Sequence, residues 1–548
     1  MSEHRPQDHN QHRIEATTMG DLLLRGADKW PDNDAVIFPD DRVTYAELAR
    51  RAWQRAASLK ALGIGRGDHV GILMPNCLDF VEIIFGAALL GGIAVPINAR
   101  FKSTELAYVI ENADIKVMVT SDLNSEYADF ADLLCQAFPG LADAQDPTSL
   151  ALEAAPLLRT MVMMGDSQPN GFMSRQGFDA LSDGVDRADI DADRVCIKLR
   201  DPCIMMYTSG TTANPKGCPL SNEALVRTSI NMTRERFFLS ETDRFWGALP
   251  MFHMASTLPM LASLYEGAAF LSMNHIDAGV ALQMMEDEKV TIAFPSFPTI
   301  TNELINHPNF KTTDLSHMRR INNVAPPDVL RKFQDAFPQA VQTGAFGLTE
   351  VSGVIAYNHP DETLEQRLHT CGRPFPGMEV RIIDPDTTED MPQGERGEIL
   401  ARGYAVFEGY YKSPEKNAEA FLDGWFRTGD LGSLDEHGAI MFHGRIKDML
   451  KVGGENVAAV EIESLLANHP AVKLAQVIGV PDDRLIEVAA AYIELNPGAT
   501  ATEQEIIDFC KGDIASFKIP RHVRFVTDWP MSSTKIQKFK LRDQYDAE

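Results

Sequence analysis

The hydroxyl-rich run Tyr207-Thr-Ser-Gly-Thr-Thr-Ala-Asn-Pro-Lys-Gly217 is the part of the sequence best suited to chemistry. Its hydroxyl groups, its glycine and its lysine could surround phosphate oxygens with hydrogen-bond donors and one positive charge. It differs from the P-loop GxxxxGK[ST], because Lys216 lies six residues after Gly210 and precedes Gly217. The run therefore predicts a phosphate-binding loop of another kind, with a Ser/Thr-rich surface turn as the alternative.

Four later segments also carry residue types suited to nucleotide chemistry. In chain order they are Phe346-Gly-Leu-Thr-Glu350, Trp425-Phe-Arg-Thr-Gly-Asp430, Gly444-Arg-Ile-Lys-Asp-Met-Leu-Lys-Val-Gly-Gly-Glu-Asn456 and Pro530-Met-Ser-Ser-Thr-Lys-Ile-Gln-Lys538. Each has a structural alternative when taken alone: Phe346 could be a core residue, Asp430 a turn residue and Lys535 a solvated charge. The hypothesis of a nucleotide site therefore depends on the set of motifs and their order.

Together the five motifs resemble the signature of the adenylate-forming superfamily, which includes acyl-CoA synthetases, peptide-synthetase adenylation domains and luciferases. The resemblance covers nearly the whole chain, residues 15–542. It implies that the chain joins a carboxylic acid to AMP with ATP and Mg²⁺, and passes the acyl group to the thiol of coenzyme A. We therefore expect an AMP-forming acyl-CoA synthetase, an ATP-dependent acid–thiol ligase of fatty acid and lipid metabolism that releases AMP and pyrophosphate.

The resemblance implies a nucleotide site with a role for each motif residue. Glu350 would bind Mg²⁺, Thr349 the α-phosphate and Phe346 the adenine ring. Asp430 would accept hydrogen bonds from both ribose hydroxyl groups, and Arg445 would lie near the ribose. The other residues expected to contact ATP are Thr208, Ser209, Gly210, Thr211, Thr212, Lys216 and Gly347.

The resemblance also implies two reaction steps served by different residues. Lys535 would bridge the substrate carboxylate and the α-phosphate while the acyl-adenylate forms. The C-terminal domain would then turn about Asp448 and remove that lysine from the site. The same rotation would bring in a segment that leaves room for the pantetheine arm of coenzyme A, and its residues are Lys451, Gly453 and Gly454.

Three positions depart from the usual pattern of the family. Ala213 stands where the phosphate loop commonly has glycine, and its Cβ restricts positive φ. Thr534 stands where glycine usually precedes the catalytic lysine, in a motif one residue short. Val324, in Asn322-Asn-Val-Ala-Pro326, would narrow the space beside the adenine and the acyl group. None of these changes removes a charged group that the chemistry needs.

The acid that the chain activates is not readable from individual residues. His253, in Pro250-Met-Phe-His-Met254, resembles a histidine that gates the acyl pocket of acyl-CoA synthetases, with a core histidine as an equal alternative. The run Gly453–Glu461 and the Val324 position are similar to ligases for short or polar acids such as crotonobetaine and carnitine, and to medium-chain ligases. We expect small acids to be preferred.

The sequence pattern predicts an α/β protein with more than one domain. Strands such as His69–Leu73 and Val117–Thr120 alternate with helical segments, which indicates parallel, doubly wound sheets. Residues 372–445 consist of short strands and turns, and a mixture of strands and helices follows Arg445. We therefore expect a large N-terminal AMP-binding domain over residues 1–445, with two doubly wound sheets and a β-rich subdomain, and a small, mobile α+β domain over 446–548.

Composition excludes several other classes of protein. The net charge of −27 would repel a polyphosphate backbone, so we expect no nucleic-acid partner. The apolar stretch Ile83–Ile97 is too short to span a bilayer, and no secretory signal is visible, which predicts a cytoplasmic protein. Seven scattered cysteines show no metal-ligand spacing. The expected partners are small molecules, and a homodimer is left open.

Two other functions are compatible with the same motifs. The chain could load its acyl group onto a carrier protein instead of coenzyme A, although the absence of a fused carrier domain favours coenzyme A. It could also bind an adenylate without catalysis, because Ala213 and the shortened lysine motif could mark lost activity. ATP–pyrophosphate exchange with a panel of acids would separate the enzyme from the inactive binding protein.

Overall fold

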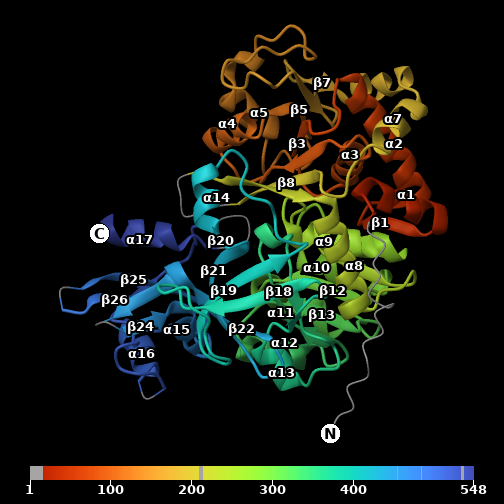
Figure 1. Cartoon of the computed structure of the whole chain (residues 1–548). Helices are drawn as coiled ribbons and strands as arrows, with labels where there is room; N and C mark the ends of the chain where they lie inside the picture. Colours follow the sequence, from red (N-terminus) through yellow and green to blue (C-terminus); the bar gives the residue numbers. More distant parts are fainter. Residues whose placement is uncertain are drawn as a thin grey trace.

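The computed structural model describes residues 17–208, 214–452, 455–482, 484–511, 513–531 and 536–547. It contains two large sheets, a β-rich part and a C-terminal lobe that stands to one side of the larger body (Figure 1). Within the described ranges, every helix is too short or too polar to cross a bilayer.

The first large sheet has seven strands, and the two strands at one of its edges flank the predicted phosphate loop. Its neighbouring strands run parallel, except for the antiparallel pair β8 and β9. In spatial order the strands are β7 (Met173–Ser174), β6 (Thr160–Met163), β5 (Ile115–Thr120), β3 (His69–Leu73), β4 (Ile93–Pro96), β8 (Pro202–Thr208) and β9 (Lys216–Ser221).

The second large sheet also has seven strands, which are parallel apart from the edge pair β1 and β2. In spatial order they are β14 (Val341–Thr343), β13 (Arg320–Asn323), β12 (Ile292–Ser296), β10 (Arg244–Trp246), β11 (Ala269–Leu271), β1 (Asp34–Phe38) and β2 (Asp41–Thr44). Ligands of such sheets bind beyond the carboxyl ends of the strands, which is where Val324 follows β13.

A single hydrophobic core joins one face of the first sheet to the second sheet. Helices that contribute several buried residues to it are α1 (Met19–Lys29), α2 (Tyr45–Ala61), α3 (Leu78–Leu89), α8 (Asn222–Met232), α9 (Met254–Glu266), α10 (Ala278–Asp287) and α11 (Pro298–Asn306). The opposite face of the first sheet is covered by α4 (Ser103–Asn112) and α5 (Phe130–Ala137). Helices therefore cover both faces of the first sheet, as predicted for a doubly wound fold.

The β-rich part is antiparallel and lies between the second sheet and the C-terminal lobe (Figure 1). Its five-stranded sheet contains β18 (Met378–Ile383), β19 (Gly397–Gly403), β20 (Phe421–Leu422), β21 (Trp425–Leu434) and β22 (Ile440–Arg445). A three-stranded sheet contains β15 (Ala345–Phe346), β16 (Ala356–Tyr357) and β17 (Arg373–Pro374). This confirms the predicted change to short strands after residue 372.

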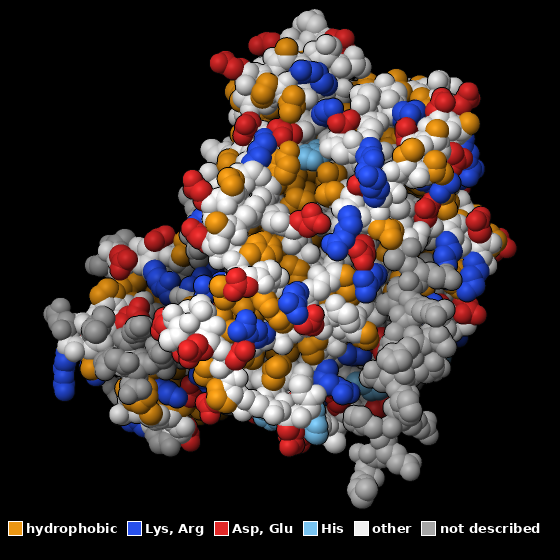
Figure 2. All heavy atoms as spheres, in the orientation of Figure 1, with side chains coloured by type: hydrophobic (Ala, Val, Ile, Leu, Met, Phe, Trp, Pro, Cys, Tyr) orange, Lys and Arg blue, Asp and Glu red, His pale blue; other side chains and the backbone are white. Residues whose placement is uncertain are grey.

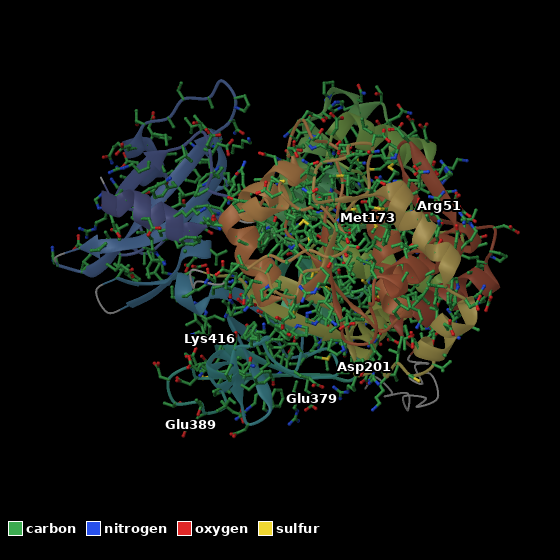
Figure 3. All side chains as sticks on the ribbon, turned by 90° about the horizontal axis from the view of Figure 1, so that it is seen from above. Arg51, Met173, Asp201, Glu379, Glu389 and Lys416 are labelled. Atoms are coloured by element: carbon green, nitrogen blue, oxygen red, sulfur yellow. The ribbon has the colours of Figure 1, made fainter. Side chains whose placement is uncertain are left out.

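The C-terminal lobe is a five-stranded sheet with helices. Its elements are β23 (Met449–Val452), β24 (Glu455–Ala458), α15 (Ala459–Leu466), β25 (Val472–Asp482), β26 (Ile486–Leu495), α16 (Glu503–Phe509), β27 (His522–Phe525) and α17 (Lys538–Ala547). The short helix η6 (Ile446–Asp448) separates it from β22. Figure 3 shows the lobe, in blue, beside the larger body. The α+β composition is confirmed, and the domain boundary between residues 445 and 446 stays a prediction.

The remaining helices complete the described fold. They are α6 (Arg175–Ala180), α7 (Arg187–Arg194), α12 (Pro327–Ala336), α13 (Leu364–His369), α14 (Pro414–Ala420), and the one-turn helix η5 (Thr349–Val351) that carries the predicted metal ligand.

A buried ion pair joins α2 to α3. Arg55 Nε lies 2.9 Å from Glu82 Oε2, and the side chains are 6% and 2% exposed. Arg55 keeps its contacts with Asp179 and Asp79 when Glu82 is neutralised, but it loses its most buried partner, so we expect Glu82→Gln to lower the free energy of unfolding by about 2 kcal/mol. The half-exposed Glu47, which pairs with Arg50, provides the control. Glu47→Gln should cost less than about 1 kcal/mol, and equal losses in chemical denaturation would contradict this account.

Candidate active site

Two antiparallel strands hold the ends of the predicted phosphate loop together. Strand β8 ends at Thr208, β9 begins at Lys216, and these two residues are opposite one another in the register. Thr208 Oγ1 is buried and has no hydrogen-bond partner among the described residues. A buried hydroxyl without a partner is unfavourable, so this position fits an oxygen-rich ligand such as a phosphate.

Tyr410 brings the candidate phosphate and metal residues together. Lys216 Nζ lies 4.3 Å from the centroid of the Tyr410 ring. The Tyr410 hydroxyl donates a hydrogen bond to Glu350 Oε1 at 2.9 Å. Burial and the neighbouring Glu350 carboxylate raise the pKa of Tyr410, which keeps the phenol protonated as a donor. Thr349 precedes Glu350 in η5, so the predicted α-phosphate ligand is in the same turn.

Glu350 is a single carboxylate, which suits a metal ion that also binds substrate phosphates and water. Glu350 is 9% exposed. Within the described ranges, no group of three or more His, Cys, Asp or Glu side chains could hold a metal ion. Mg²⁺ in nucleotide enzymes is commonly bound by one or two carboxylates together with substrate phosphates and water. Glu350 beside the phosphate-loop lysine therefore fits Mg²⁺ that arrives with ATP.

The predicted ribose residues form a pair on adjacent strands. Asp430 of β21 and Arg445 of β22 are opposite one another in the register, with Arg445 Nε 3.3 Å from Asp430 Oδ1. The Asp430 side chain is 5% exposed and that of Arg445 is 39% exposed. The Asp430 backbone N–H donates to Thr428 Oγ1 at 3.1 Å. The structure thus places an oriented carboxylate and a cation side by side.

Phe346 lies in the core of the larger body, with only 4% of its surface exposed. Its ring centroid is 6.1 Å from that of Phe442 on β22, and Phe442 is 42% exposed. A Cβ on Gly347 would lie 2.0 Å from the Gly353 carbonyl oxygen, so the turn that carries Thr349 and Glu350 requires glycine there. The structure therefore places Phe346 close to the strand that carries Arg445.

The predicted acyl-pocket residues lie at the ends of secondary-structure elements. His253 is half-buried at the start of α9, with its ring centroid 4.8 Å from that of Phe252. Val324 follows β13, is 48% exposed, and donates its backbone N–H to the Ser296 carbonyl at 2.8 Å. Asn76 accepts the Met251 N–H at 2.7 Å and so fixes the segment before His253.

Several predicted site residues lie outside the described residues. They are Ser209, Gly210, Thr211, Thr212, Gly453, Gly454 and Lys535, together with Ala213 and Thr534. Lys451 is described by its backbone in β23 only. On either side of Lys535, Met531 and Ile536 form an antiparallel bridge, and the Gln537 N–H donates to the Pro530 carbonyl at 2.7 Å.

Sequence reasoning missed Tyr410. The residue lies in Gly409-Tyr-Tyr-Lys412, where two tyrosines follow a glycine, and that pattern has no specific chemical meaning. Its importance comes from long-range contacts, because Glu350 and Lys216 are distant from it in sequence and near it in the fold.

Comparison with known families identifies the chain. The model of the AMP-binding enzyme family matches residues 23–411, and that of the AMP-binding enzyme C-terminal domain matches residues 461–535. The chain belongs to the AMP-binding enzyme family. This family of AMP-forming acyl-CoA synthetases is the one that the five motifs predicted.

Similar proteins match over nearly the whole length of the chain. YngI of Bacillus subtilis strain 168 is 35% identical over 96% of this chain and 97% of its own. The mitochondrial medium-chain acyl-CoA ligase ACSF2 of Rattus norvegicus is 34% identical over 98% of this chain and 89% of its own. The crystal structure of the anthranilate CoA ligase AuaEII in complex with anthranoyl-AMP superposes with a TM-score of 0.85, at 27% identity, over 98% of this chain and 99% of that one.

Proposed function

We propose that this chain is an acyl-CoA synthetase that uses ATP and Mg²⁺ to convert a carboxylic acid first to an acyl-adenylate and then to an acyl-CoA. The observation that carries the proposal is that Tyr410 contacts both Lys216 and Glu350, and that Thr208, opposite Lys216, has a buried hydroxyl with no partner among the described residues. A cation, a carboxylate and a hydroxyl at one place suit a metal–triphosphate. The names of the similar ligases support coenzyme A as the acceptor.

In the first step, a carboxylate oxygen of the substrate attacks the α-phosphorus of ATP, and the bond to the β-phosphate oxygen breaks. Thr208 and Lys216 would hold the departing pyrophosphate, and Asp430 would fix the ribose. Bound Mg²⁺ would neutralise charge on the phosphate oxygens. Hydrogen-bond donors that are already in place before the reaction stabilise the transition state more than the ground state. The alignment of the two reactants supplies the rest of the rate enhancement. The product is an acyl-adenylate, in which AMP is a good leaving group for the next step.

In the second step, the sulfur of coenzyme A attacks the acyl carbon and AMP leaves. Lys535 would occupy the approach path during the first step, so the C-terminal lobe would have to turn before the thiol could enter. The segment from Lys451 to Gly454 would then face the site. This assignment of roles rests on the family resemblance and on the position of η6 between the β-rich part and the lobe.

The experiment that tests the proposed function is a coenzyme-A-dependent screen for AMP release over acids of different chain length and polarity. We expect release only when an acid, ATP, Mg²⁺ and coenzyme A are all present. ATP–pyrophosphate exchange without coenzyme A should proceed with the same acids. Exchange without thioester formation would favour a carrier protein as acceptor, and no exchange with any acid would contradict the proposed enzyme.

We propose small to medium-chain monocarboxylic acids as the substrates. ACSF2 is named as a medium-chain ligase, and Val324 places a β-branched, partly exposed side chain where the acyl group is predicted to lie. The cytoplasmic location stays a prediction, because that relative is mitochondrial.

Val324→Gly should broaden the range of acids. Removing the branched side chain enlarges the predicted pocket, and one or two methylene groups change kcat/KM by about tenfold or more. We expect kcat/KM for long-chain acids to rise about tenfold relative to that for short acids. Val195→Gly, at another exposed valine, should leave the ratio unchanged. If acids of about sixteen carbons already gave the highest kcat/KM in the unaltered enzyme, the pocket assignment would be wrong.

A further inference from the structure

Tyr410 lies between a candidate phosphate-binding side chain and the candidate metal ligand. We infer that Tyr410 is a positioning residue, which orients the Glu350 carboxylate toward the metal ion of metal-bound ATP and holds the Lys216 ammonium beside the phosphates. The inference rests on the proposed function and assigns a role to a residue outside the five motifs.

The two contacts use different parts of the tyrosine side chain. Its hydroxyl donates to Glu350 Oε1 at 2.9 Å, and the face of its ring lies 4.3 Å from Lys216 Nζ. A hydrogen bond to a carboxylate is strong and directional, so it selects one orientation of the Glu350 side chain. It uses one acceptor position of Oε1 and leaves the other lone pairs of the carboxylate for a metal ion. The attraction between an ammonium group and an aromatic face restricts the flexible lysine side chain.

The backbone of Tyr410 is held by Asn417, in the middle of α14. The Tyr410 N–H donates to Asn417 Oδ1 at 2.6 Å, and Asn417 Nδ2 donates to the Tyr410 carbonyl at 3.0 Å. Gly409 has φ of +136°, and a Cβ there would lie 2.8 Å from Asn417 Nδ2. The ring of Phe407 packs edge-on against that of Tyr410, with centroids 4.8 Å apart. These contacts fix the direction in which the phenol points.

The same segment is joined to the elements that carry both partners. The Phe407 N–H donates to the Glu350 carbonyl at 2.9 Å, and the Tyr411 N–H donates to the Gly217 carbonyl at 2.8 Å. The Tyr411 hydroxyl and Lys412 Nζ each lie 2.7 Å from an oxygen of Asp114, at the corner between α4 and β5. The segment therefore connects the Glu350 turn, the start of β9 and the first sheet, so the phenol cannot move independently of the groups it contacts.

Equilibrium binding of ATP, without turnover, tests the inference. The measured quantity is the ratio of the Kd for metal-free ATP, in EDTA, to the Kd for Mg–ATP, obtained by calorimetry on the full chain. For Tyr410→Phe we expect the Kd for metal-free ATP to stay within about twofold, because the ring beside Lys216 remains. The ratio should fall about tenfold, because a hydrogen bond to the charged carboxylate is lost. An unchanged ratio would overturn the inference.

Tyr404→Phe is the matched control. Tyr404 is also buried, its hydroxyl accepts a hydrogen bond from Asn231 at 2.7 Å, and Arg227 lies 4.0 Å from its ring centroid. Like Tyr410, it has a hydrogen-bonded hydroxyl and a cation over its ring, but neither contact involves Glu350 or Lys216, so the substitution should leave the ratio unchanged. A fall in the ratio equal to that of Tyr410→Phe would mean that loss of any buried hydroxyl weakens the site, and would overturn the inference.

Two more variants separate the two contacts. Tyr410→Leu removes the ring as well, so metal-free ATP should bind about threefold more weakly in addition to the fall in the ratio. In the Glu350→Gln background, Tyr410→Phe should cause no further fall in the ratio, because its partner has lost its charge. A further tenfold fall there would overturn the inference. Acid-dependent ATP–pyrophosphate exchange by the unaltered enzyme tests the proposed function separately, because the binding ratio needs no acid.

Discussion

Lys535→Ala should lower the rate of acyl-adenylate formation by about three orders of magnitude. The lysine ammonium would neutralise the attacking carboxylate and the α-phosphate at the moment when both carry negative charge. Without it, two anions must approach one another with no cation between them. The measurement is single-turnover formation of acyl-adenylate, or ATP–pyrophosphate exchange, with the acid that gives the highest rate in the unaltered enzyme.

The same variant should retain the second step. Given chemically synthesised acyl-adenylate and coenzyme A, Lys535→Ala should form thioester at close to the normal rate, because the lysine has then left the site. Lys540→Ala provides a control, since that lysine is exposed in the same basic segment. Equal losses in both half-reactions would mean that the lysine serves the whole cycle, or the fold, and would contradict the division of labour.

Contacts around the lysine segment indicate which part of the molecule it moves with. Lys538 Nζ lies 2.6 Å from Glu463 Oε1, which joins the start of α17 to α15. The Val477 N–H on β25 donates to the same Glu463 oxygen at 2.7 Å. The start of α17 is therefore fastened to the C-terminal lobe, and we expect Lys535, three residues before it in the sequence, to move with the lobe.

The sequence predicted elements well where local pattern and long-range packing agree. Strand β3 has the predicted bounds His69–Leu73, and the apolar stretch from Ile83 runs from the buried helix α3 into β4. Thr502 and Glu505 form a capping box at the start of α16. In each case the residues that start, stop or bury the element are neighbours in the sequence, so the pattern contains the information.

Residues 121–200 show little local pattern, because their structure depends on distant partners. Strand β6 is a short apolar segment that pairs with β5, and β7 has only two residues and pairs with β6. Helix α2 illustrates the same limit: Arg55 is a charged residue, but it is only 5% exposed because Glu82 of α3 lies opposite. Such pairings are properties of the tertiary fold rather than of a local sequence window.

The order of the motifs predicted which residues form the site, but it did not predict which of them contact one another. The structure brings Asp430 together with Arg445, and Lys216 close to Glu350 through Tyr410. Phe346 is almost completely buried, which agrees with the alternative that it is a core residue. The sequence did not reveal the contacts of the segment around Tyr410, which join three elements that are far apart in the chain.

The second large effect is expected at the hinge. Asp448 lies in the one-turn helix η6, between β22 and β23. Rotation of the C-terminal lobe requires large changes of φ and ψ at a few residues of such a connection. A proline ring would hold φ near −65° and prevent the change of φ that rotation requires, so Asp448→Pro should trap the lobe in one arrangement.

We expect Asp448→Pro to retain most ATP–pyrophosphate exchange and to lose about a hundredfold or more in thioester formation, because we predict that the trapped arrangement of the lobe is the adenylating one. Asp448→Ala is the control, since it removes the same carboxylate and leaves φ free. It should support both half-reactions at close to the normal rate. If the alanine variant lost thioester formation to the same extent, the carboxylate rather than the rotation would be responsible.

Gly453→Leu tests the same step, thioester formation, by obstructing the path of coenzyme A. It places a side chain where the pantetheine arm is predicted to pass, and it leaves Lys216, Glu350 and Lys535 in place. Like Asp448→Pro, it should form acyl-adenylate and accumulate it on the enzyme, because the next step is blocked. Bound acyl-adenylate and free thioester would be measured in single-turnover experiments. If both variants made thioester at the rate of the unaltered enzyme, alternation of the lobe about Asp448 would not operate in this protein.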